Sequence, residues 1–142
     1  MKKDEIFLVD TNLIIYAYEI ENSIRKKKSL EILEKCFKKE IVLAVSNQNL
    51  AEFAFVALKK LKLDAKTVKE IVKDISEFKG FKKINYKRKT ILSAIDISEE
   101  QKMSFWDSLI SAAMIENGIF NIYTENSKDF KIPSLKVVNP FF

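Results

Sequence analysis

Short, uninterrupted apolar runs are the feature that most constrains the fold of this chain. Segments in which apolar residues recur at helical spacing separate these runs. A strand that is apolar on both faces is typical of a parallel sheet covered by helices on both sides. The alternation of such strands with helices therefore predicts an α/β sandwich with a mostly parallel sheet. The predicted strands span residues 6–9, 41–45, 119–123 and 135–138.

The predicted helices connect these strands. The first begins near Leu13, directly after the first strand, and the others span about 23–38, 46–61, 65–78, 86–95 and 104–117. Gly118 follows the last helix, a position where glycine commonly ends a helix. The chain has 142 residues and contains no linker or internal repeat, so we expect one domain over residues 1–142.

Composition excludes several kinds of chemistry. The chain has no histidine, which rules out an imidazole base, a Ser/His triad and a histidine-bound zinc site. Its single cysteine allows no intramolecular disulfide and is typical of a reducing compartment. No apolar run reaches the length of a signal-peptide core or a membrane span, so we expect a cytoplasmic protein with no membrane partner. The net charge of +5 is compatible with an RNA partner, and equally with a solubilising surface.

Three carboxylates are each the sole charge in a long uncharged window. Asp10 is alone between residues 6 and 18, Glu52 between 41 and 58, and Asp107 between 103 and 115. Charged residues make up 32% of the chain, so uncharged windows of this length are unexpected. A carboxylate among apolar neighbours is costly to bury unless it is paired. A divalent metal ion held by several carboxylates is one economical partner.

Helix capping is the alternative for each acid taken singly. Asp10 is placed to cap the first helix. Glu52 lies three residues after Asn49, and Asp107 three residues after Ser104, which is the spacing of a capping box. Taken together, three isolated carboxylates near strand ends and helix starts favour a shared site.

A fourth acid, Asp129, lies in a polar segment after the third predicted strand. Charged residues surround it, so an ordinary loop carboxylate is the alternative there. Thr124 and Asn126 in the same segment are candidates for turn formation. In open parallel sheets, ligands bind outside the carboxyl ends of the strands, and both Asp10 and this segment follow such ends.

In four blocks, the sequence resembles the PIN-domain family, especially its VapC-type toxin ribonucleases. The blocks occur in order along nearly the whole chain. They are Leu8-Val9-Asp10-Thr11-Asn12, Ser46-x-Gln48-x-x-x-Glu52-Phe53, Phe105-x-Asp107-x-Leu109-Ile110-x-Ala112-Ala113 and Thr124-x-Asn126-x-x-Asp129-Phe130.

The resemblance implies a PIN-like three-layer sandwich with an acidic pocket that binds Mg²⁺ or Mn²⁺. It also implies cleavage of RNA, a homodimer and a small antitoxin partner. The matching catalytic and metal-binding positions are Asp10, Glu52, Asp107 and Asp129, with Thr11, Asn12, Thr124 and Asn126 orienting them. Because the fourth block varies among family members, Glu125 is the alternative fourth acid.

Several other families with acidic sites share pieces of this pattern. A haloacid-dehalogenase-type phosphatase needs a second Asp where Asn12 stands, and a response-regulator receiver needs a phosphorylated Asp where Ser46 follows the second strand. An RNase H-like fold opens with several antiparallel strands, whereas this chain enters a helix after Asp10. The main alternative is a non-catalytic PIN-like module that binds RNA or a protein, and a purely structural subunit is the third.

The first 80 residues contain more apolar side chains than one small core obviously needs. The sequence therefore predicts that some of them remain exposed and form a homodimer contact or bind an antitoxin segment. The residues named for this surface are Ile14, Tyr16, Tyr18, Phe55 and Leu58.

Overall fold

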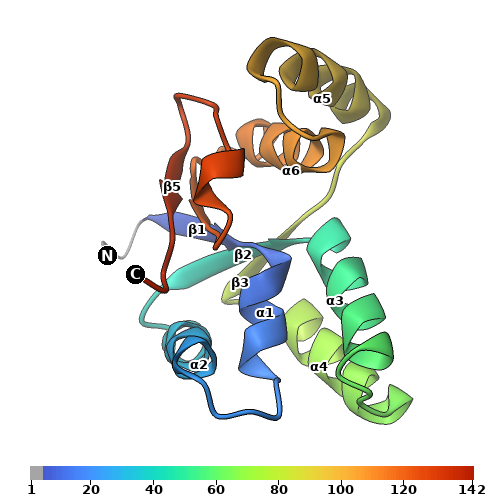
Figure 1. The fold of residues 1–142 in the computed structure, drawn as a ribbon, viewed down its shortest axis with the longest axis vertical. Coiled ribbons are helices and arrows are strands. Elements are labelled where there is room, and N and C mark those ends of the chain that lie inside the picture. The colour runs from blue at the N-terminus through green and yellow to red at the C-terminus, as the bar shows by residue number, and fades with distance from the viewer. Residues whose placement is uncertain (1–4) are drawn as a thin grey trace.

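The computed structural model describes residues 5–142 and contains a five-stranded parallel sheet (Figure 1). The strand order is β3-β2-β1-β4-β5, so the first strand is central. Leu8 of β1 pairs with Ala44 of β2 on one side and with Ile122 of β4 on the other. The predicted α/β class and parallel sheet are confirmed. The strands are β1 (Ile6–Val9), β2 (Val42–Ser46), β3 (Phe81–Ile84), β4 (Asn121–Tyr123) and β5 (Lys136–Val138).

Helices cover both faces of the sheet, as Figure 1 shows. Four pack on one face: α1 (Thr11–Ala17), α2 (Ile24–Phe37), α3 (Asn47–Lys59) and α4 (Ala65–Glu77). On the other face α6 (Phe105–Glu116) packs on the sheet, and α5 (Arg88–Gln101) packs on α6. A short 3-10 helix, η1 (Ser127–Asp129), follows β4.

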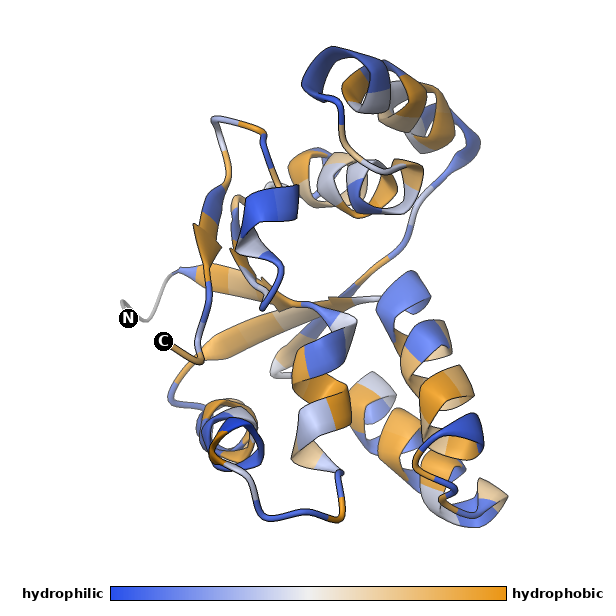
Figure 2. Cartoon of the chain, viewed as in Figure 1, coloured by the Kyte–Doolittle hydropathy of each residue, from blue (hydrophilic) through white to orange (hydrophobic). Residues whose placement is uncertain are grey.

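The central strands are buried on both faces, which explains their uninterrupted apolar runs. Phe7 and Val9 contribute to the core beneath α1–α4, whereas Leu8 between them contributes to the core beneath α6. All three are 3% exposed or less. In Figure 2 the strands are mostly apolar, while the outer helices carry apolar and polar stripes.

The edge strand β3 was not predicted. Its sequence, Phe81-Lys82-Lys83-Ile84, has buried residues only at its two ends, and both lysines are exposed. It therefore lacks both the apolar run of a central strand and the alternation of a half-buried one. Lysines on an edge strand also hinder pairing with another chain.

Two other predictions need correction. Helix α5 continues to Gln101 rather than ending near residue 95, and Lys102 ends it in a left-handed conformation with φ of 53°. Ile14 and Tyr16 belong to the core, with exposures of 0% and 9%, because α1 packs between α2 and α3. Tyr18 is half-buried. Only Phe55, 62% exposed, and Leu58, 45% exposed, remain as surface apolar residues of that group.

Within residues 5–142, no helix combines the length and apolarity needed to cross a membrane. The predicted stop at Gly118 is confirmed, since this glycine follows the C-cap Asn117 with φ of 69°.

Candidate active site

The predicted acids come from four separate segments that meet at the carboxyl edge of the sheet. Asp10 directly follows the central strand β1, and the η1 segment that carries Asp129 follows β4. Glu52 projects from α3, which starts where β2 ends, and Asp107 lies in the first turn of α6. Figure 1 shows α3 and α6 on either side of this edge.

Asp10 is held through both carboxylate oxygens. Its Oδ1 accepts a hydrogen bond from the Thr11 N–H at 2.8 Å, which caps α1, and its Oδ2 accepts one from the Thr124 hydroxyl at 2.7 Å. Burial raises the pKa of Asp10, and these two hydrogen bonds offset part of that rise. The capping hypothesis for Asp10 is thus confirmed, but capping leaves the carboxylate able to bind a further partner. Each oxygen has a second lone pair that can face a cation.

A buried relay positions Glu52. The Thr11 hydroxyl donates to Glu52 Oε1 at 3.1 Å and accepts from Asn49 Nδ2 at 3.1 Å. Asn49 is fully buried, and its Oδ1 accepts from the Ser46 hydroxyl at 2.7 Å and the Ser46 N–H at 3.2 Å. Because the Asn49 amide donates to Thr11, the Thr11 proton must point to Glu52.

This relay overturns the proposed Asn49–Glu52 capping pair. The capping box of α3 is formed by Ser46 and Asn49, so Asn49 is the third helical residue and Glu52 lies beyond the first turn. Sequence reasoning missed the role of Asn49. Its only signal was the spacing of Ser46 and Asn49 at the end of a buried strand, which fits a capping box.

Asp107 is half-buried and faces the same site from the opposite helical layer. Its N–H donates to the hydroxyl of Ser104, the N-cap of α6, at 3.1 Å, which confirms the predicted Ser104 cap. Burial raises the pKa of its carboxyl, the Ser104 hydroxyl lowers it, and the charges of Asp10 and Asp129 raise it further.

The acids repel one another across the site. Burial raises the pKa of Glu52, and so do the charges of Asp10 and Asp107. The two ion pairs found among residues 5–142, Arg25–Glu19 and Lys136–Glu5, involve none of the candidate acids. No three acidic side chains in this part of the chain are close enough to hold one ion as they stand. The structure therefore brings the acids within electrostatic range without closing them around a single point.

The structure distinguishes Asp129 from Glu125, the two candidate acids of the fourth sequence block. The charge of Asp129 reaches Asp107, whereas the Glu125 carboxylate lies beside the Tyr16 hydroxyl and helps burial raise the pKa of Tyr16 to about 12. Thr124 is 2% exposed and accepts the Asn126 N–H at 3.1 Å, so a local turn fixes its hydroxyl toward Asp10. Of the residues expected to orient the acids, Thr11 and Thr124 bind them directly. Among the hydrogen bonds of residues 5–142, the side chains of Asn12 and Asn126 form none to an acid.

The donor set fits a hard divalent cation. Carboxylates, hydroxyls and amides are the available ligands, and the site contains no histidine or cysteine that would favour zinc. A bound cation would also neutralise carboxylates that no cationic side chain of residues 5–142 pairs.

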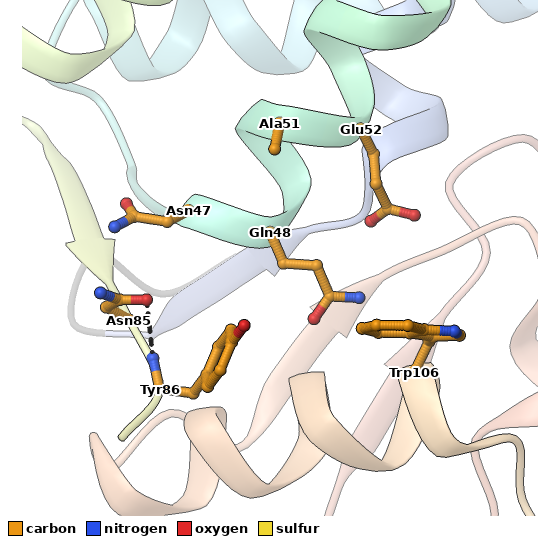
Figure 3. A pocket seen from close by; sticks show the side chains of 7 residues that line it. All are labelled: Asn47, Gln48, Ala51, Glu52, Asn85, Tyr86 and Trp106. Atoms are coloured by element: carbon orange, nitrogen blue, oxygen red, sulfur yellow. Dashed lines mark hydrogen bonds between the residues drawn. The ribbon is translucent and has the colours of Figure 1, made fainter. Parts of the chain in front are cut away.

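A hollow lies directly beside the acids (Figure 3). Glu52 belongs both to the group of acids and to the lining of the hollow. The indole of Trp106, the residue before Asp107, forms part of the wall of the hollow. Sequence reasoning did not single out this hollow. Its lining residues are Asn47, Gln48, Ala51, Glu52, Asn85, Tyr86 and Trp106.

Comparison with known proteins identifies both a family and a fold. A family model described as PIN domain matches residues 7–133. No curated protein matches the sequence. A toxin–antitoxin complex from Klebsiella pneumoniae contains a similar chain, with a TM-score of 0.68 and 23% identity over 94% of this chain and 97% of that one.

Two further solved structures are similar. The Mycobacterium tuberculosis toxin VapC20, described as cleaving the sarcin–ricin loop, gives a TM-score of 0.63 with 16% identity over 86% of this chain and 92% of that chain. VapBC2 from Rickettsia felis, bound to a DNA fragment from its promoter, gives a TM-score of 0.64 with 23% identity over 94% of this chain and 98% of that chain. These likenesses establish a shared fold over nearly the whole length of each chain.

Proposed function

This chain belongs to the PIN-domain family, and we propose that it is an endoribonuclease dependent on Mg²⁺ or Mn²⁺, acting as the toxin of a toxin–antitoxin pair. The observation that carries the proposal is that several carboxylates meet at the carboxyl edge of a parallel sheet, where they repel one another and form no ion pair within the described part of the chain. The proposed site residues are Asp10, Glu52, Asp107 and Asp129.

A divalent ion, when bound, would neutralise negative charge on the phosphate and lower the pKa of a bound water molecule. Asp10 and Asp107 are the proposed direct ligands, since Asp10 follows the central strand and Asp107 faces it from the first turn of α6. Thr124 and Thr11 fix the orientations of Asp10 and Glu52 through the bonds described above.

Glu52 and Asp129 are proposed to orient the attacking water. In a site without imidazole, a carboxylate is the available proton acceptor, and a raised pKa makes it a better base at neutral pH. Glu52 meets this condition, and its oxygen bonded to Thr11 cannot swing away freely.

Metal dependence is the direct test. RNA cleavage should disappear in EDTA and return on addition of Mg²⁺ or Mn²⁺, while Zn²⁺ should substitute poorly because its preferred nitrogen and sulfur ligands are lacking. The matched control is Asp10→Asn, which should remain inactive under every metal. Full cleavage by the wild type in excess chelator would refute the mechanism.

The alternative is a PIN-like module that binds RNA or a protein without cleaving it. The observation in its favour is that no three acids among residues 5–142 are gathered around one point. Calorimetric titration with Mg²⁺ separates the two. A cleaving site should bind the ion in the wild type and lose affinity in Asp10→Asn, whereas a non-catalytic module need not bind it at all.

Association with a second copy or a small antitoxin is part of the proposal. Phe55 and Leu58 lie exposed on α3, and a groove between α3 and α4 continues this surface over Val68 and Val72. Apolar surface of this kind commonly marks a protein interface. Light scattering of the purified chain, and recovery of a small partner from cells, test the two associations.

A further inference from the structure

Two aromatic side chains are exposed at the hollow beside the acids. Trp106 is 61% exposed, and Tyr86 is 38% exposed. The indole rests edge-on against Phe105 at 5.3 Å between ring centroids, and Phe105 packs on the core between α5 and α6. Trp106 is therefore anchored at one edge, while most of its surface faces solvent.

The other wall of the hollow carries amides. Asn47 and Gln48 come from the first turn of α3, and Asn85 follows β3. The Asn85 Oδ1 accepts the Tyr86 N–H at 2.9 Å, which leaves its NH₂ group available to a ligand. Figure 3 shows Gln48 reaching between Glu52 and Tyr86, with Trp106 across from Glu52. Aromatic faces beside groups that both donate and accept hydrogen bonds match the surface of a nucleobase.

A strongly basic segment adjoins the hollow. Residues 82–89 contain five cations and no acid, and all five are exposed. Asn85 also lines a second, smaller hollow with Lys83, Lys87 and Lys89. The one acid there, Glu116, accepts a hydrogen bond from the Thr90 hydroxyl. The order along this surface is thus carboxylates, aromatic and amide groups, then lysines.

We propose that the hollow lined by Tyr86 and Trp106 binds one unpaired base of single-stranded RNA, next to the phosphate held at the acids. A neighbouring phosphate of the same strand then contacts the lysines of residues 82–89. This inference rests on the proposed ribonuclease function and assigns a base-binding site beside its acids. Paired bases are stacked inside a duplex and cannot enter such a hollow, so recognition requires an unpaired nucleotide. Stacking on aromatic rings beside a basic track is how proteins commonly hold single strands.

Trp106 is the only tryptophan in the chain, so its fluorescence reports on the hollow alone. A short single-stranded RNA titrated into the wild-type protein in EDTA and low salt should quench this fluorescence as it binds. The same RNA in a duplex, or with abasic sites throughout, should quench far less. RNA that binds, by anisotropy of a labelled strand, without altering the fluorescence would overturn the inference, as would an absence of binding.

Steady-state kinetics on a labelled RNA provide the second arm. Because stacking of a base contributes about 1–3 kcal/mol, Trp106→Leu and Tyr86→Leu should each raise KM by roughly 5- to 150-fold with kcat little changed. Trp106→Phe should retain most of the affinity. Phe120→Leu is the matched control, because Phe120 is 43% exposed and precedes β4 at the opposite edge of the sheet.

The outcomes separate this inference from the proposed function. If the wild type cleaves RNA with Mg²⁺ and both leucine variants have its KM, the base site is wrong and the nuclease stands. If the wild type never cleaves but single-stranded RNA quenches Trp106, the base site stands and the nuclease is wrong. Loss of binding to a protein partner in both leucine variants, with RNA binding unchanged, would assign the hollow to a protein and overturn the inference.

Discussion

Replacing Asp10 by asparagine removes the central charge of the site while keeping its hydrogen bonds. The asparagine Oδ1 can accept the Thr11 N–H that caps α1. Its amide can donate to the Thr124 hydroxyl, which is able to accept as well as donate. We therefore expect Asp10→Asn to fold and to lose RNA cleavage.

Asp10→Ala is the matched comparison, because it removes the charge and the cap together. Loss of an N-cap costs about 0.5–2 kcal/mol. The buried Thr124 hydroxyl also loses its acceptor, at a further cost of about 1–3 kcal/mol. The free energy of unfolding of the metal-free protein should therefore fall by roughly 1.5–5 kcal/mol in Asp10→Ala. In Asp10→Asn it should stay unchanged or rise slightly, since repulsion of Glu52 and Asp107 is relieved.

The pH dependence of stability gives a second measure of the same charge. Asp10, Glu52 and Asp107 all have pKa values raised by folding, so the folded state holds protons that the unfolded state releases. The free energy of unfolding of the metal-free protein should then decrease as pH rises from about 4 through the raised pKa values. This decrease should be smaller in Asp10→Asn, which has one such group fewer and weaker repulsion between the others.

Urea denaturation in EDTA and in Mg²⁺, with RNA cleavage measured in parallel, tests these expectations. At 100 times its dissociation constant, Mg²⁺ should stabilise the wild type by about 2.7 kcal/mol, and this gain should shrink sharply in Asp10→Asn. A variant that still cleaves RNA and is stabilised by Mg²⁺ as much as the wild type would show that Asp10 caps the helix and does not form the site.

Four further substitutions test the surrounding residues. Thr124→Val removes the donor to Asp10 Oδ2 and should lower metal affinity by about 10- to 100-fold, measured as the Mg²⁺ dependence of cleavage. Asn49→Ala removes the donor to the Thr11 hydroxyl and the acceptor of the Ser46 hydroxyl, and it should cost about 1–3 kcal/mol of unfolding free energy, measured in urea. Asp129→Asn should abolish cleavage while Glu125→Gln should retain it, because the charge of Asp129, unlike that of Glu125, raises the pKa of Asp107. The reverse result would make Glu125 the fourth acid.

The parts of the fold that were predictable are those whose side chains are buried on both faces. The runs at β1 and β2 are apolar because each residue meets a helical layer on one side or the other. β3 escaped prediction because an edge strand needs only a few buried contacts, here Phe81 and Ile84. The surface assigned to Ile14 and Tyr16 was wrong for a related reason. An amphipathic pattern shows that a helix has an apolar face, but it does not show how much of its circumference neighbouring elements cover.

The candidate site was predictable only through its charges. Asp10, Glu52 and Asp107 stand out because the helices and strands around them are buried and carry no other charge. The supporting residues give no such signal. Asn49 lies in an ordinary helix start, and its bond to Thr11 joins residues 38 positions apart. Tyr86 lies between β3 and α5 and Trp106 in the first turn of α6, and only the folded chain places both beside the start of α3.

Asp10, Glu52 and Asp107 lie in segments of the chain that contain no lysine or arginine. This separation explains how acids can gather in a chain with net charge +5. A lysine within reach of Asp10 or Glu52 would form a stable ion pair, lower the pKa of the acid and occupy the place of a metal ion. The cations are instead concentrated outside the uncharged windows, most densely in residues 82–89. Within residues 5–142 the acids form no ion pair, and a bound divalent cation would relieve the repulsion between them. Under the proposed function, the exposed cations of residues 82–89 would attract the RNA whose phosphate that ion neutralises.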